Sequence, residues 1–128
     1  MRSRFSAFAK KQADYLWRTL HPDHEDRQHD EAVVLRSIRA TASEMRYAGL
    51  AILDRRGPDE AGVAQVLFFA RLFQGSAERS FVELSDFAHD GAGWRYLRGA
   101  LRGIGALKGD PMALTIPAFV EVVARSGR

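Results

Sequence analysis

The middle of the chain, residues 63–97, constrains the fold more than any other segment. It contains three runs rich in aromatic and β-branched side chains, at residues 63–73, 81–87 and 94–97. Two turn signals, Gly75-Ser76 and Asp90-Gly91, separate the runs. Runs of this kind bounded by Gly, Asp and Ser are typical of β-strands joined as hairpins. This segment therefore predicts an antiparallel meander.

The segments before the meander predict helices and one more strand. Apolar residues at three- and four-residue steps indicate a helix over residues 3–20, which Lys10-Lys11-Gln12 could divide in two. A further helix is predicted from an N-cap at Asp30 to Ser43, with a buried face of Val34, Leu35, Ile38 and Ala42. Residues 44–54 predict the first strand, with Tyr47 on the face opposite Leu50 and Ile52. The fold class is therefore α+β, with N-terminal helices packed in a curved four-stranded antiparallel sheet.

The segment after the meander differs in composition, because four glycines punctuate residues 99–109. We interpret its first part as a flexible lead into a short terminal helix that begins at Asp110-Pro111 or Ile116-Pro117. The apolar face of this helix would hold Phe119, Val120 and Val123. A helix this short is marginal alone. We therefore expect residues 100–128 to be an appendage that docks on a cone domain of residues 1–99 or on a second subunit.

Composition excludes several classes of site. The 128 residues suit a single domain, and the absence of cysteine excludes disulfides, thiolate zinc sites and thiol catalysis. No apolar run reaches the roughly 20 residues that a membrane-spanning helix needs. The N-terminal segment also lacks the apolar region of a signal peptide. We expect a cytoplasmic protein that does not enter a membrane.

Several short motifs resemble, in order, the central domain of YchJ-like proteins. They are Met1-Arg-Ser-Arg-Phe-Ser-Ala-Phe, Ala13-Asp-Tyr-Leu, Thr19-Leu-His-Pro, Gly49-Leu50, Phe68-Phe-Ala-Arg71, Glu83-Leu-Ser85-Asp-Phe87, Asp90-Gly91 and Trp94-Arg-Tyr96. Together they cover about residues 1–99. The resemblance implies a nuclear-transport-factor-2-like cone, which agrees with the strand and helix pattern.

The chain also departs from the family pattern. It has Tyr47 where the family usually has Trp, Val82 where His is usual, and Leu84 where Arg is usual. The family's domain is commonly flanked by Cys-rich SEC-C motifs thought to bind zinc, and this chain has no cysteine. We therefore expect no metal and no cofactor. The resemblance leaves the biochemical role of the family undefined.

The candidate site consists of polar residues within the matching motifs. They are Arg4, Tyr15, His21, Arg71, Glu83 and Ser85. On a strand, Glu83 and Ser85 share a face with Phe81 and Phe87, so Glu83 is expected to be half-buried and to need a cation. Arg71 or Arg4 could supply it.

Two interpretations of Glu83 follow. The one we favour is an ion pair that joins helix to sheet. The other is a ligand-binding or acid/base carboxylate at the mouth of the cone. His21 also has a structural and a functional interpretation. It is either a helix-terminal histidine hydrogen-bonded to the backbone or a general acid or base.

Three further patterns carry weaker signals. The segment from His21 to Asp30 has the composition of a metal site without a ligand spacing, so we interpret it as a solvated acidic loop. The glycines of residues 99–105 lack the lysine and the strand context of a phosphate loop. The aromatic residues near Arg95, Arg98 and Arg102 could stack bases, but half-buried strand aromatics are more often core. The sequence thus argues against nucleic acid as a partner.

Two functions remain open from the sequence. The first is a non-catalytic binding or interaction module with a small apolar pocket, whose partner is a small molecule or a protein, and which could dimerise through its sheet or its C-terminal helix. The second is a small-molecule isomerase or dehydratase that uses Glu83 or His21 as its base. The second rests on fold analogy, and we assign no catalytic residue from it.

Overall fold

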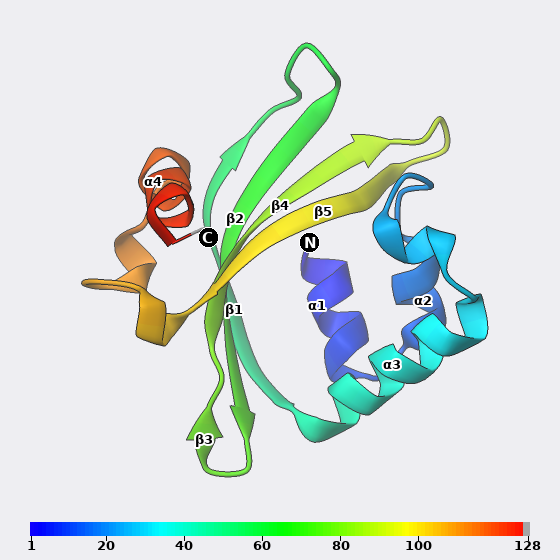
Figure 1. Ribbon diagram of the computed structural model, residues 1–128, viewed down its shortest axis with the longest axis horizontal. Helices are drawn as coiled ribbons and strands as arrows, with labels where there is room; N and C mark the ends of the chain where they lie inside the picture. Colours follow the sequence, from blue (N-terminus) through cyan, green and yellow to red (C-terminus); the bar gives the residue numbers. More distant parts are fainter. Residues whose placement is uncertain (127–128) are drawn as a thin grey trace.

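The computed structural model describes residues 1–126 and has the predicted α+β architecture (Figure 1). The helices before the sheet are α1 (Arg2–Ala9), α2 (Ala13–Arg18), the 3₁₀ helix η1 (Glu25–Gln28) and α3 (Glu31–Glu44). The strands are β1 (Arg46–Arg56), β2 (Val63–Gln74), β3 (Ala77–Glu78), β4 (Phe81–His89) and β5 (Trp94–Gly103). The 3₁₀ helices η2 (Ile104–Ala106) and η3 (Pro111–Ala113) then lead to α4 (Ile116–Ser126).

The sheet is antiparallel, with the strand order β1-β2-β4-β5. The predicted four-stranded meander is confirmed, and the short strand β3 adds a small extension that pairs with β2. The register places Phe68 of β2 beside Glu83 of β4, and Ser85 of β4 beside Gly99 of β5. This register decides which polar side chains meet on each face of the sheet.

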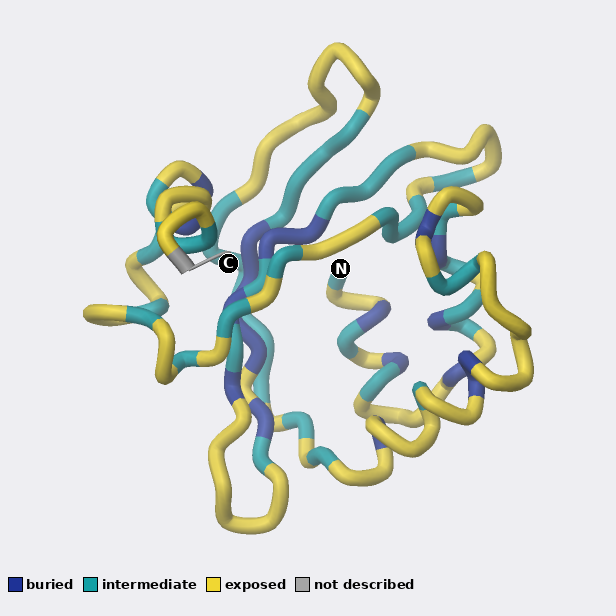
Figure 2. The backbone as a smooth tube through the Cα atoms, viewed as in Figure 1, coloured by how far each residue is buried: buried dark blue, intermediate teal, exposed yellow. Residues whose placement is uncertain are grey.

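Helices cover both faces of the curved sheet (Figure 1). Helices α1, α2 and α3 lie on one side, which we call the inner face, where Met1 and Phe5 pack against Phe68, Ala70 and Leu72. Helix α4 lies on the other side, the outer face. The buried core there consists of Leu67, Phe69, Val82, Leu84, Ile116 and Phe119. Burial is concentrated in the middle of the long strands, and the hairpin tips are exposed (Figure 2).

The N-terminal helices begin and end close to the predicted residues. The predicted break at Lys10-Lys11-Gln12 separates α1 from α2, and Lys11 has a φ of 58° in the left-handed region. Asp30 is the N-cap of α3, where its side chain accepts a hydrogen bond from the backbone N–H of Ala32 at 3.2 Å. The predicted inner side of α3 is buried at three of its four positions, and Ile38 is half-buried.

A β-bulge changes the predicted faces of β1. The register steps from Tyr47 beside Leu72 to Gly49 beside Arg71, which inserts one extra residue into β1. Tyr47 therefore shares the inner face with Leu50 and Ile52, and the prediction of opposite faces was wrong. The reason is that a bulge breaks the two-residue alternation from which the faces were inferred.

The segment after residue 99 also differs from its prediction. Strand β5 continues to Gly103, where it pairs with Phe81, so the first glycines belong to the sheet and not to a flexible lead. Helix α4 begins at the second of the two predicted positions, Ile116, while a single 3₁₀ turn forms at Pro111.

Helix α4 packs on the outer face of its own sheet. Phe119 is fully buried and Val123 packs against the same core, but Val120 is 48% exposed, so its predicted place on the apolar face was wrong. Val120 follows Phe119 directly, and adjacent helix positions point about 100° apart. The division of the chain at residue 99 remains a prediction, and residues 127 and 128 lie outside the described residues.

No helix within residues 1–126 combines the length and the apolar character that crossing a membrane requires.

Candidate functional site

Tyr96 of β5 lies at the centre of a polar cluster on the inner face. The guanidinium of Arg4 lies over its ring, 4.7 Å from the centroid, and the ring centroid of His24 is 5.4 Å away. The Tyr96 hydroxyl donates a hydrogen bond to Oε2 of Glu83 at 2.8 Å. Burial, and then the nearby Glu83 carboxylate, raise the pKa of Tyr96 well above its ordinary value. The hydroxyl is therefore protonated at neutral pH and can donate to Glu83.

Glu83 is held through one of its two carboxylate oxygens. Oε2 accepts the bond from Tyr96 and a second one from the Oγ of Ser85 at 2.6 Å. Within residues 1–126, the other oxygen, Oε1, receives no hydrogen bond from the protein. It is not a fully buried atom either, because the one fully buried polar side-chain atom without a partner in these residues is Nε of Arg27. Oε1 is thus neither satisfied by the protein nor sealed from solvent.

Gly99 makes room for this arrangement from the neighbouring strand. A Cβ at this position would overlap both Oε2 of Glu83 and the hydroxyl of Tyr96, and it would lie 2.7 Å from Cδ of Glu83. The close approach of these two side chains across β4 and β5 therefore requires glycine.

Arg4 does not form the predicted ion pair with Glu83. Its side chain is buried, with 7% exposed, and its Nη1 donates hydrogen bonds to the carbonyl oxygen of Leu16 at 3.0 Å and to Oγ1 of Thr19. Within residues 1–126, no carboxylate oxygen lies within 4.0 Å of its nitrogens. Tyr96 lies between the two groups, with Arg4 on its ring face and Glu83 at its hydroxyl.

The charge of Arg4 is therefore only partly compensated. Burial lowers the pKa of Arg4, and the interactions with Tyr96 and Glu83 offset part of that shift. Arg4 joins α1 to the C-terminal end of α2, because its two hydrogen bonds reach Leu16 and Thr19.

Arg71 lies away from this cluster. It is on the outer face with Phe69, whereas Glu83 is on the inner face beside Phe68. Its side chain is 53% exposed and approaches Glu78 at 4.0 Å. The predicted contact between Arg71 and Glu83 was wrong, since positions of opposite parity on paired strands point to opposite faces of the sheet.

The two remaining predicted residues, Tyr15 and His21, have separate places. Tyr15 donates a hydrogen bond from its hydroxyl to Oγ of Ser3 at 2.7 Å, which links α2 to α1. His21 follows α2, and its Nδ1 accepts a hydrogen bond from the backbone N–H of Asp23 at 3.1 Å. This is the backbone-bonded histidine that was one of the two sequence interpretations.

Sequence reasoning missed three residues of the cluster. His24 was assigned to a solvated loop, yet it is buried against Tyr96, and its Nδ1 accepts a hydrogen bond from the N–H of Asp26 at 3.0 Å. Tyr96 was treated as core, although its place in the matching Trp94-Arg-Tyr96 motif was a usable signal. Gly99 carried no such signal, because its role depends on the strand pairing.

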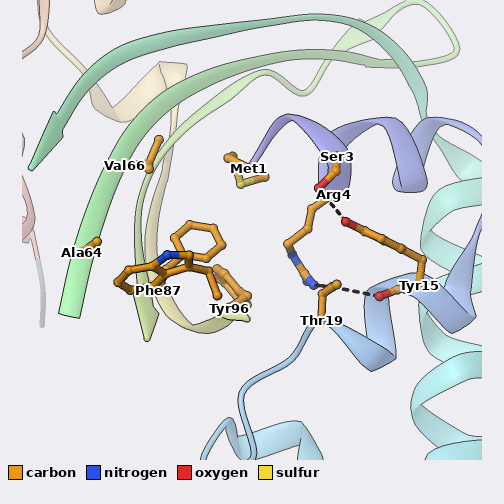
Figure 3. A pocket seen from close by; sticks show the side chains of 10 residues that line it. Met1, Ser3, Arg4, Tyr15, Thr19, Ala64, Val66, Phe87 and Tyr96 are labelled. Carbon is orange, nitrogen blue, oxygen red and sulfur yellow. Dashed lines mark hydrogen bonds between the residues drawn. The ribbon is translucent and has the colours of Figure 1, made fainter. Parts of the chain in front are cut away.

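Two hollows adjoin on the inner face, and Met1, Arg4 and Tyr96 line both of them. The larger has a volume of about 350 Å³ and contains Glu83 in a lining that is otherwise mostly apolar, with Phe5, Tyr47, Phe68, Phe81 and Leu101 among its walls. The smaller has a volume of about 310 Å³ and lies between helix residues such as Ser3, Tyr15 and Thr19 and sheet residues such as Val66 and Phe87 (Figure 3).

The acidic loop at the end of α2 gives no metal geometry. Within residues 1–126, no three His, Asp or Glu side chains gather closely enough to hold an ion. His21 and His24 each approach an aspartate two residues along the chain, at 3.8 Å and 3.9 Å.

Comparison with known proteins assigns the family. The model of the middle nuclear-transport-factor-2-like domain of YchJ matches residues 1–99. The chain belongs to the YchJ family. It is also similar to UPF0225 proteins of Bordetella pertussis, Bordetella parapertussis and Bordetella bronchiseptica, each 34% identical over 102 residues that cover 80% of this chain and 69% of the relative. No solved structure gave a significant match.

The YchJ match includes the inner face and its polar cluster. Arg4, Glu83 and Tyr96 lie within residues 1–99, and Gly99 is the last matched residue. Helix α4, which covers the outer face, lies beyond the matched region.

Proposed function

We propose that this YchJ domain is a binding module for a small, largely apolar molecule that carries a hydrogen-bond donor. The ligand would occupy the larger hollow and donate to Oε1 of Glu83. The observation that carries the proposal is the open carboxylate oxygen at the wall of an apolar cavity of about 350 Å³. Ligand pockets typically have volumes of about 300–1,000 Å³, mostly apolar walls and a few placed polar groups.

The Glu83 carboxylate is preorganised for this task. Its Oε2 is bound by Ser85 and Tyr96, so the orientation of Oε1 is defined before a ligand arrives. A ligand amine, amide N–H or hydroxyl would supply the hydrogen bond that the protein leaves open. Ligands of this class would lose little binding energy to reorganisation, because the polar anchor is already ordered.

The test compares matched donors and non-donors. Benzylamine and benzyl alcohol are titrated against toluene, and binding is followed by ligand-observed NMR. The two donors are expected to bind and toluene to bind more weakly, because toluene leaves Oε1 without a partner. Equal binding of all three would contradict the role of Glu83, and absence of binding by all three would contradict the proposed cavity.

Two variants and one control locate the site. Glu83→Gln is expected to weaken benzylamine binding about 10-fold or more, since a hydrogen bond to a charged group contributes about 1.5–3 kcal/mol. Leu101→Trp, at a wall residue that is 47% exposed, is expected to fill the cavity and exclude both donors. Glu121→Gln removes an exposed carboxylate on α4 and should change nothing.

An acid/base function is the second candidate, and it rests on the same open oxygen. If Glu83 removes a proton next to a carbonyl, as an isomerase or dehydratase requires, simple ketones should exchange those protons with solvent deuterium in the presence of the protein. Glu83→Gln should abolish the exchange. Binding of donors without any exchange would leave the binding module as the function.

A further inference from the structure

The smaller hollow adjoins the larger one but has chemistry of its own. Its helix wall carries the polar side chains Ser3, Arg4, Tyr15 and Thr19, and its sheet wall carries Ala64, Val66, Phe87, Trp94 and Tyr96 (Figure 3). Glu83 does not line it. Most of the polar side chains are therefore on the helix wall and most of the apolar and aromatic ones are on the sheet wall, and the single cationic side chain of the lining is Arg4.

Arg4 is a buried cation with free hydrogen-bonding capacity. Both of its hydrogen bonds come from Nη1. Within residues 1–126, Nε and Nη2 have no protein partner, and neither is sealed off from solvent. Together these two nitrogens form the edge of the guanidinium that binds a carboxylate with two parallel hydrogen bonds.

The environment of Arg4 favours an anion. A buried charge is normally paired, because taking it out of water is costly unless an opposite charge lies close by. No carboxylate of residues 1–126 lies within 4.0 Å of the Arg4 nitrogens. Burial lowers the pKa of Arg4, which is the mark of incomplete compensation. A bound anion would supply the missing charge.

The rest of the hollow favours an aromatic ring. Tyr15, Phe87, Trp94 and Tyr96 contribute four aromatic side chains to its lining. Phe87 and Tyr96 are packed edge to face with centroids 5.7 Å apart, and Trp94 is 47% exposed at the start of β5. Aromatic rings stack or pack edge to face on such walls, which contributes beyond the burial of apolar area.

We propose that the smaller hollow binds a small aromatic carboxylic acid, with the carboxylate on the Nε and Nη2 edge of Arg4 and the ring among Phe87, Trp94 and Tyr96. This site shares Met1, Arg4 and Tyr96 with the larger hollow but does not rest on the proposed function, because Glu83 does not line it and its polar anchor is a cation and not a carboxylate. An inorganic anion lacks the ring and would gain only the contact with Arg4.

The experiment uses benzoate as the probe, with benzamide and cyclohexanecarboxylate as matched ligands. Binding is measured by calorimetry and by the fluorescence of Trp94 in a Trp17→Phe background, which removes the other tryptophan. Benzoate is expected to bind and to change the Trp94 emission. Benzamide lacks the charge and so loses the charge-assisted bidentate bond. Its affinity is expected to be at least about tenfold lower than that of benzoate. Cyclohexanecarboxylate and phosphate are expected to bind more weakly than benzoate.

The variants separate Arg4 from general electrostatic attraction. Arg4→Gln is expected to remove benzoate binding, whereas Arg2→Gln, at an exposed position of the same helix, is expected to retain it. Because Arg4→Gln also removes contacts between α1 and α2, Trp94→Ala provides a second test at a half-exposed position. Trp94→Ala is expected to weaken benzoate binding in calorimetry while the protein stays folded, as judged by a cooperative melting transition.

Several results would overturn this inference. They are no benzoate binding by the native chain, equal affinity for benzoate and benzamide, phosphate binding as tight as benzoate, and benzoate binding that survives Arg4→Gln. Glu83→Gln distinguishes the two sites, since it should weaken benzylamine and leave benzoate binding equal or stronger. A result in which benzoate binds and benzylamine does not would support this site and contradict the proposed function.

Discussion

Substitution of Gly99 by alanine tests the polar cluster at its tightest contact. The added Cβ would overlap Oε2 of Glu83 and the Tyr96 hydroxyl, so at least one of these side chains must move. A movement of either side chain by itself would lengthen or break the hydrogen bond of 2.8 Å that joins them. Gly99→Ala should therefore destabilise the fold, although glycine in a strand interior is otherwise replaced with a gain in stability.

The magnitude follows from the two opposing effects. Loss of one hydrogen bond to a charged group costs about 1.5–3 kcal/mol. The lower entropy of the unfolded chain with alanine returns about 0.4–1 kcal/mol. The net destabilisation is then about 0.5–2.6 kcal/mol, which corresponds to a fall in melting temperature of roughly 2–13 °C for a chain of this size.

The assay is urea denaturation followed by circular dichroism, with Gly103→Ala as the control. Gly103 lies on the same strand, and a Cβ there would meet nothing within 4 Å. Gly103→Ala is expected to be neutral or stabilising. The penalty for Gly99→Ala should also shrink in a Glu83→Ala background, because one of the two overlaps disappears. Equal effects of the two glycine substitutions would refute the close packing of Glu83 and Tyr96 against β5.

Three titrating groups yield further predictions. The raised pKa of Tyr96 means that stability should fall as the pH rises above about 10, the ordinary tyrosine value, and Tyr96→Phe should remove part of that loss in alkaline denaturation curves. Asp54 accepts a hydrogen bond from the N–H of Ile116 at 2.8 Å, which lowers the pKa of its carboxyl, so the stability that Asp54 contributes should be lost as the pH falls below about 4, the ordinary aspartate value. Asp54→Ala should destabilise the protein at neutral pH, and an unchanged melting temperature would contradict the role of Asp54 in docking α4. Burial lowers the pKa of His24, so the stability of the protein should decrease as the pH falls from about 6.5 towards the pKa of His24 in the folded state. His24→Asn retains an acceptor for the N–H of Asp26 and should flatten this pH dependence, measured as denaturation midpoints.

The elements of the fold were largely predictable because their signals are local. Alternation and turn residues predicted the long strands, the Asp30 N-cap predicted the start of α3, and the polar Lys10-Lys11-Gln12 predicted the break at Lys11. Each of these signals lies within a few residues of the feature that it predicts. The family resemblance was likewise carried by short motifs, and the match over residues 1–99 confirms it.

The candidate site was predicted in part. Glu83 and Ser85 are hydrogen-bonded as neighbours on one strand face, which the alternation on β4 implies. Arg4 lies in the same cluster, but it approaches Tyr96 and not Glu83. Arg71 was wrongly included, because the choice between the two faces of β2 depends on a register that the sequence does not state.

The sequence by itself therefore determined the family, the order of helices and strands, and the presence of charged residues on strands that must be half-buried. The tertiary structure alone decided that Tyr96 lies between Arg4 and Glu83, that His24 packs on its ring, and that Gly99 leaves the space these groups need. The physical reason is that helix and strand signals arise from neighbours along the chain, whereas contacts across a sheet depend on register, bulges and curvature. A shift of one residue in the register of β5 would turn Tyr96 to the other face of the sheet and so separate it from Glu83.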